Sequence, residues 1–177
     1  MKKSVILIPT KIEAQLVEKK DHIIISGIAK GTIKTLKRLH EVTPISKAVL
    51  IGFAGRLDDS LEIAGTYNVT EVTNGVHHLS LSAITKKWLN VSIITVKKPV
   101  HTISKKLELA KIAKLVDMES FYFVEYCLLN NITPYMVRII SDNCDRPLLD
   151  FFKASAFKET KTELQKAVKI IEQQLSL

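Results

Sequence analysis

Four residues that could take part in chemistry follow predicted strands at widely separated points of the chain. They are Glu13, Gly55, Glu119 and Asp142. Because α/β sheets display their chemistry where strands end, these residues should converge on one rim of the sheet. Carboxyl groups brought together in this way can divide acid and base work, one donating a proton while another activates water. The pattern therefore predicts a catalytic site assembled from distant parts of the chain.

Each carboxylate also has a simpler structural interpretation. Glu13 lies in the first turn of a predicted helix and could only complement its dipole. Asp117 or Glu119 could cap the helix predicted at 121–129, and Asp142 could cap a turn or pair with Arg138. In these alternatives the same side chains stabilise the fold and take no part in a reaction.

The elements that must position these residues alternate between strands and helices. Short β-rich runs predict strands at 4–8, 22–26, 47–51, 67–72, 91–96 and 135–140. Helical patterns are predicted at 11–19, after Gly31, at 80–89, at 105–114 with Ser104 as N-cap, at 121–129 and at 156–175. We therefore expect an α/β fold, a three-layer αβα sandwich around a central mixed sheet, in a single domain spanning 1–177.

Composition excludes several classes of protein. With 46% hydrophobic and 25% charged residues the sequence is ordinary for a soluble globular protein. No run approaches the roughly 20 apolar residues of a membrane span, and no signal peptide is visible, so we expect a cytoplasmic protein without a membrane partner. The net charge of +8 comes from scattered lysines without a nucleic-acid motif, so we expect no nucleic-acid partner. Cys127 and Cys144 are expected to be thiols, and no metal-ligand spacing links them to the histidines.

Several motifs resemble the nucleoside phosphorylase and nucleosidase superfamily. They are D-M-E at 117–119, R-x-x-S-D at 138–142, P-T-x-x-E-A at 9–14, G-x-x-K at 27–30 and G-x-A-G at 52–55, the last with Phe53 as its variable residue. The pattern is most similar to methylthioadenosine/S-adenosylhomocysteine nucleosidases and futalosine hydrolases. This resemblance implies a phosphorylase/hydrolase-like fold, hydrolysis of a purine-type nucleoside without cofactor or metal, and a homodimer. A futalosine-type substrate would place the reaction in menaquinone biosynthesis.

The resemblance also implies a role for each site residue. Asp142 would protonate the leaving base, and Glu13 would activate water. Glu119 would bind the ribose hydroxyls, while Met118 would pack beneath the sugar. The rest of the substrate site would consist of Gly55, Phe53, Val100 and Ser141.

The sequence departs from the family pattern at three places. Leu50 and Phe53 stand where phosphorylases hold an arginine and a serine for phosphate, which favours water as the nucleophile. Pro99 and Val100 stand near the position of the usual base-stacking aromatic residue, and the stretch 72–91 is short. Two alternatives therefore remain open, namely a nucleoside phosphorylase and a catalytically silent nucleoside-binding protein of the same fold.

Overall fold

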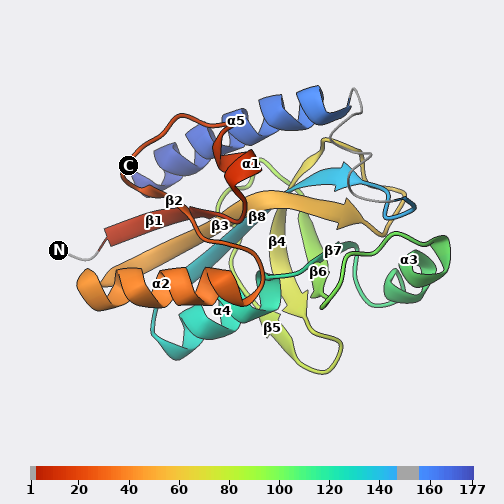
Figure 1. Cartoon of the computed structure of the whole chain (residues 1–177), viewed down its shortest axis with the longest axis horizontal. Helices are drawn as coiled ribbons and strands as arrows, with labels where there is room; N and C mark the ends of the chain where they lie inside the picture. The colour runs from red at the N-terminus through yellow and green to blue at the C-terminus, as the bar shows by residue number, and fades with distance from the viewer. Residues whose placement is uncertain (1–2, 147–155) are drawn as a thin grey trace.

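The apolar run near the N-terminus forms strand β1 (Lys3–Ile8), whose side chains alternate between two hydrophobic cores. Val5 and Leu7 belong to one core, and Ile6 and Ile8 to the other. This period of two is expected of a strand covered on both faces. The computed structural model describes residues 3–146 and 156–177, and in Figure 1 β1 lies between helices on either side.

A mixed β-sheet forms the centre of the protein. Its other strands in the described ranges are β2 (Ile23–Ile25), β3 (Ile45–Arg56), β4 (Thr66–Thr73), β5 (His78–Ser80), β6 (Asn90–Thr95), β7 (Leu115–Asp117) and β8 (Thr133–Asp142). β3, β8, β4, β6 and β7 pair in that order, and β7 pairs back with β3. Five strands therefore close into a barrel, while β1 and β2 extend from β3, and β5 extends from β4.

The predicted mixed α/β sheet is thus confirmed, but the three-layer sandwich is not confirmed in that detail. The difference comes from β3, which continues to Arg56 although the sequence predicted a strand only at 47–51. β1 pairs with the first part of β3, and beyond it the same edge pairs with β7 through Gly55 and Arg56. Sheet twist turns this long strand far enough for the ring to close.

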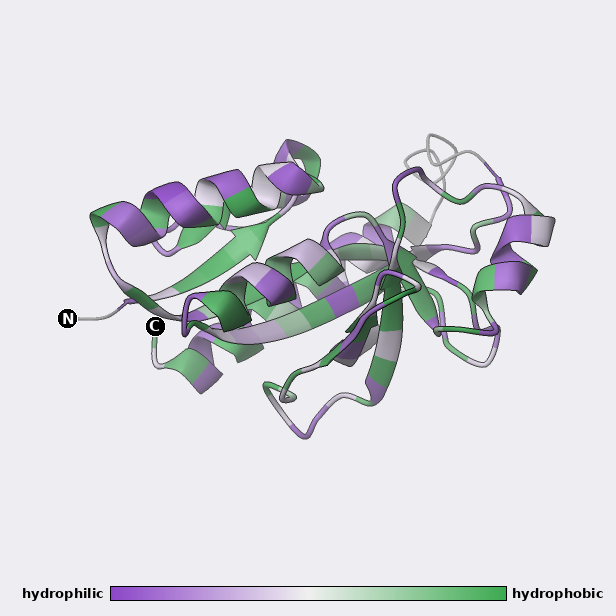
Figure 2. Cartoon of the chain, turned by 90° about the horizontal axis from the view of Figure 1, so that it is seen from below, coloured by the Kyte–Doolittle hydropathy of each residue, from purple (hydrophilic) through white to green (hydrophobic). Residues whose placement is uncertain are grey.

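The helices cover the sheet from two sides. They are α1 (Lys11–Ala14), α2 (Lys30–Val42), α3 (Ile103–Leu109), α4 (Ser120–Leu129) and α5 (Ala156–Leu175). In Figure 1, α2 and α4 lie on one side of β1 and β3, and α1 and α5 lie on the other, while α3 stands apart near β6 and β7. Figure 2 shows hydrophilic and hydrophobic residues alternating along the helices, as expected of helices with one buried face. None of the described helices is long and apolar enough to cross a membrane.

Three helix predictions are wrong in their bounds or existence. The helix predicted at 11–19 ends at Ala14, and α3 begins at Ile103 with Thr102, not Ser104, as its N-cap. The stretch predicted as a helix at 80–89 contains the last residue of β5 and then no helix. The buried Asn68 donates from Nδ2 to the carbonyl oxygens of Thr85 (2.9 Å) and Trp88 (2.8 Å). These bonds hold the carbonyl groups in a loop conformation instead of a helical one.

Candidate active site

One pocket collects every residue that the sequence singled out for the site. Its lining includes Glu13, Phe53, Gly55, Val100, Met118, Glu119, Ser141 and Asp142. These residues come from α1, the far end of β3, the loop after β6, the turn between β7 and α4, and the end of β8. The residues that were predicted to converge on one rim of the sheet therefore lie together in the structure.

Hydrogen bonds to its carboxylate fix the position of Glu13 in the lining of this pocket. Its Oε2 accepts hydrogen bonds from the Thr10 backbone nitrogen (2.9 Å) and hydroxyl (2.6 Å), and the Glu13 backbone nitrogen donates to the same hydroxyl (3.1 Å). This arrangement is a capping box for α1, so the structural interpretation of Glu13 holds. However, Oε1 also accepts from the Phe53 backbone nitrogen (2.7 Å), and burial raises the pKa of the carboxyl group. A capping residue with a raised pKa that lines a pocket is also suited to proton transfer.

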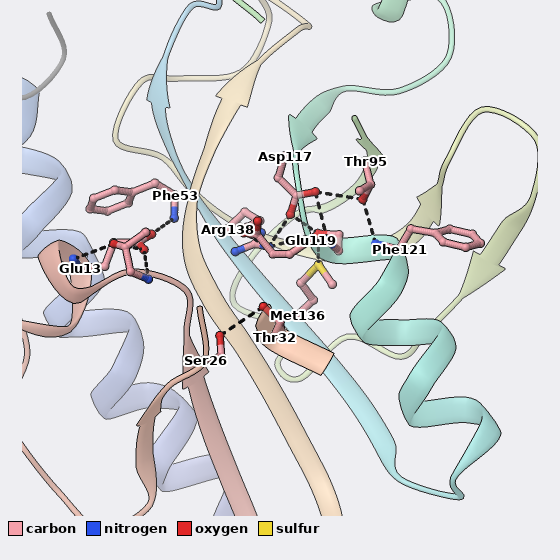
Figure 3. A network of polar contacts seen from close by, with 12 residues as sticks. Glu13, Ser26, Thr32, Phe53, Thr95, Asp117, Glu119, Phe121, Met136 and Arg138 are labelled. Carbon is pink, nitrogen blue, oxygen red and sulfur yellow. Dashed lines mark hydrogen bonds and ion pairs between the residues drawn. The ribbon is translucent and has the colours of Figure 1, made fainter. Parts of the chain in front are cut away.

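Arg138 links two further carboxylates from beneath the pocket. Its side chain is fully buried, and Nη2 donates to Asp117 Oδ2 and to Glu119 Oε1 (3.1 Å). Figure 3 shows these three side chains gathered between β8 and the start of α4. The alternative in which Arg138 pairs with Asp142 is therefore wrong. Sequence reasoning missed the role of Arg138, although a charged residue inside an apolar strand signals a buried ion pair.

Asp117 organises the start of α4. Its Oδ1 accepts from the Thr95 hydroxyl (3.0 Å) and the Ser120 backbone nitrogen (3.2 Å), and its Oδ2 accepts from the Ser120 hydroxyl. The Thr95 hydroxyl in turn accepts from the Phe121 backbone nitrogen (2.8 Å). Asp117 therefore does the capping work that the sequence assigned to either Asp117 or Glu119, since Glu119 makes no side-chain capping bond.

Glu119 faces the pocket from this network. Burial, with a further contribution from the neighbouring charge of Asp117, raises the pKa of Glu119 to about 8. Arg138 opposes the shift but does not cancel it. At neutral pH Glu119 is therefore largely protonated and can both donate to and accept from hydroxyl groups.

This raised pKa predicts a pH dependence of stability. Between pH 4.5 and about 8 the folded protein retains a proton on Glu119 that the unfolded chain releases, so the free energy of unfolding should fall as pH rises. The slope from one such group is at most about 1.4 kcal/mol per pH unit. Urea denaturation of Glu119→Gln between pH 5 and 8.5 should show a flatter profile than that of the parent. Identical slopes in the two proteins would contradict the assignment.

Asp142 is half-buried at the end of β8 and has only local partners. Oδ1 accepts from the Cys144 backbone nitrogen (2.9 Å), and Oδ2 lies 2.6 Å from the Ser141 hydroxyl. The same hydroxyl lies 3.2 Å from the carbonyl oxygen of Ala54. Ser141 can therefore donate to an ionised Asp142, or donate to Ala54 while it accepts from a protonated Asp142. Both protonation states of Asp142 are accommodated without rearrangement.

Comparison with solved structures identifies the fold. No protein-family model and no curated protein matches the sequence. The structure is similar to an aspartate-to-asparagine mutant of the Helicobacter pylori 5′-methylthioadenosine/S-adenosylhomocysteine nucleosidase with 5′-methylthioadenosine in its active site. The TM-score is 0.84 at 18% identity, covering 99% of this chain and 100% of that one. A futalosine hydrolase mutant of the same organism gives 0.85 at 17%, covering 99% and 100%. The Chlamydia trachomatis nucleosidase bound to methylthioadenosine gives 0.75 at 16%, also covering 99% and 100%.

This chain has the nucleosidase fold. The similarity confirms the nucleosidase-type fold that the sequence motifs led us to expect. Within this nucleosidase fold, Leu50 is fully buried in the core and does not line the pocket, whereas Phe53 does. Phe53 is also the only aromatic side chain in the lining among the described residues, since Pro99 and Val100 have no aromatic ring.

Gly52 makes room for Glu13 in this nucleosidase fold. A Cβ atom at Gly52 would lie 2.6 Å from Glu13 Oε1, 2.9 Å from Pro9 Cδ and 3.1 Å from Arg138 Nη1. We therefore expect Gly52→Ala to displace the Glu13 carboxylate and to lower turnover by about 10²-fold, the usual contribution of a proton-transfer group.

Gly31→Ala is the matched control for this substitution. Gly31 lies in α2, and its nearest atom would be the Ser26 carbonyl oxygen at 3.7 Å. A helical alanine there should leave turnover unchanged and stabilise the protein slightly. Steady-state kinetics beside thermal melting measures both effects, and equal turnover in the two variants would contradict the role assigned to Gly52.

Proposed function

We propose that this protein is an N-glycosyl hydrolase that cleaves a purine-type nucleoside. The observation that carries the proposal is that Glu13, Glu119 and Asp142 line one pocket in a nucleosidase fold. The substrate would be of the methylthioadenosine/S-adenosylhomocysteine type or the futalosine type, the latter in menaquinone biosynthesis. The protein would act in the cytoplasm as a homodimer of single-domain chains 1–177.

Asp142 is the general acid in this proposal. Cleavage of an N-glycosidic bond leaves positive charge on the ribose and negative charge on the departing base, as in glycoside hydrolysis. A carboxyl proton delivered to the purine ring neutralises the base as it leaves. The position of the Ser141 hydroxyl between Asp142 and Ala54 supports this role, because it stabilises Asp142 before and after the proton leaves.

Glu13 is the general base that orients and deprotonates the attacking water. Thr10 and the Phe53 backbone hold its carboxylate, which limits the entropy lost when the water is positioned. Burial raises the pKa of Glu13, which makes its carboxylate a stronger base than that of an exposed glutamate.

Glu119 and Met118 bind the ribose. Glu119 would accept hydrogen bonds from the hydroxyl groups, with Arg138 holding its carboxyl group in place. In its ionised form Glu119 would also stabilise the developing positive charge. Met118 is half-buried beside it in the lining and would pack beneath the sugar ring. Gly55, Phe53 and Val100 would complete the surface around the base and sugar.

The test is the identity of the sugar product. We expect the protein to release free sugar from an accepted nucleoside at a rate that does not depend on phosphate, because no arginine at position 50 is present to bind it. A panel of methylthioadenosine, S-adenosylhomocysteine, adenosine, inosine and futalosine, each assayed with and without phosphate, measures this. A sugar 1-phosphate product would instead identify a phosphorylase. Tight binding of a nucleoside without cleavage would identify a silent binding protein.

A further inference from the structure

The end of the pocket around Asp142 has a basic side chain at its border. The turn after β8 continues from Asp142 through Cys144 to Arg146, and all three residues line the pocket. Cys144 is buried in a small hydrophobic cluster with Val96 and Val100, so the turn is anchored against the loop after β6. Arg146 lies two residues beyond that anchor, so one short turn carries both Asp142 and Arg146 in the pocket lining.

Arg146 is suited to contact a ligand. Its Nε donates to Asp145 Oδ1 at 3.1 Å, and it makes no other hydrogen bond or ion pair within residues 3–146 and 156–177. Within these described ranges, no acceptor therefore occupies the two terminal nitrogens of the guanidinium group. Arg146 is also the only lysine or arginine in the described lining, which otherwise carries the acidic side chains of Glu13, Asp117, Glu119 and Asp142. One cation in an acidic pocket points to a ligand group that accepts hydrogen bonds.

The chemistry of a purine indicates which group this is. If Asp142 protonates N7 of the base, the substituent on C6 lies next to it, because N7 and C6 share one edge of the purine. A side chain beside Asp142 therefore meets the C6 substituent. Guanidinium donates hydrogen bonds and accepts none, so it pairs with a C6 carbonyl oxygen and cannot pair with a C6 amino group.

We propose that Arg146 is a specificity-determining residue that selects a 6-oxopurine nucleoside over the corresponding 6-aminopurine nucleoside. The inference rests on the proposed function, which it deepens by naming the class of base. Arg146 also stabilises the departing base, because the negative charge that develops on a 6-oxopurine before Asp142 has delivered its proton is shared with the C6 oxygen that the guanidinium contacts.

The test compares two nucleosides that differ only at C6, 5′-methylthioinosine and 5′-methylthioadenosine. We expect a higher kcat/KM for the 6-oxo compound in the parent protein. Arg146→Met keeps the length of the side chain but removes its donors and charge, and it should lower the ratio of the two kcat/KM values by about tenfold. Arg146→Lys should restore part of the ratio, since an ammonium group still donates to a carbonyl oxygen.

Lys98→Met is the matched control, because Lys98 is an exposed cation on the neighbouring loop and is absent from the described lining. It should leave the ratio unchanged. A parent that prefers the 6-amino compound, or an Arg146→Met variant with an unchanged ratio, would overturn the inference.

A second measurement separates this inference from the proposed function. If neither of these two nucleosides nor any member of the panel above is cleaved, the hydrolase proposal fails, and calorimetric binding of hypoxanthine and adenine still tests Arg146. Tighter binding of hypoxanthine that is lost in Arg146→Met would support the specificity role without catalysis. Equal binding of the two bases by the parent would reject it.

Discussion

Asp142→Asn is expected to lower turnover of an accepted nucleoside by about 10²-fold or more. Asparagine keeps the size and polarity of the side chain, but it has no ionisable proton to deliver to the leaving base. Its carbonyl oxygen can still accept from the Cys144 backbone nitrogen, so the turn after β8 should survive. Steady-state kinetics and thermal melting on the same variant should therefore show lost chemistry with a nearly unchanged Tm.

Asp58→Asn provides a matched control for this substitution. Asp58 is also half-buried and follows the end of β3, but it pairs with Lys114 and is absent from the described lining. Its replacement should leave turnover unchanged. Near-parent turnover in Asp142→Asn, together with a clear fall in Tm, would instead assign Asp142 a purely structural role.

Arg138→Met is expected to cost the largest share of stability, about 3–5 kcal/mol. The guanidinium is fully buried, neutralises the buried Asp117 carboxylate and donates a hydrogen bond to the buried Glu119 carboxyl group. Methionine fills much of the same volume but leaves Asp117 without its cation. Urea denaturation at pH 7 measures the loss in free energy of unfolding.

Two further variants test this explanation. Asp117→Asn combined with Arg138→Met removes the uncompensated charge, so the double variant should recover part of the lost stability. Arg38→Met removes an exposed arginine of α2 and should change stability by less than about 0.5 kcal/mol. A loss of under about 1 kcal/mol in Arg138→Met would contradict the role of Arg138 as the counter-ion of this cluster.

The sequence by itself determined the features that depend on local pattern. The strand β1 and the helix α5 have bounds close to their predictions. The continuous apolar run of β1 and the apolar stripe of α5 each lie within a single segment of the sequence, so local pattern is enough to predict them. The eight predicted site residues could be chosen because strand ends, short motifs and the family resemblance mark them, and the structure places all of them in one pocket. Their chemical roles stay predictions until the kinetic tests are made.

Only the tertiary structure decided how these segments meet. The barrel closes through two residue pairs between β3 and the three-residue strand β7, and no spacing in the sequence records that pairing. The ion-pair partners of Arg138 could not be predicted either, since Asp117, Glu119 and Asp142 are all candidates in the sequence. In the structure the buried Arg138 pairs with Asp117 and Glu119. The stretch 80–89 has a plausible helical pattern, yet the side chain of Asn68 on a neighbouring strand binds its carbonyl groups. Strand partners, buried ion pairs and such long-range hydrogen bonds depend on which surfaces come together, and local propensity carries no information about that.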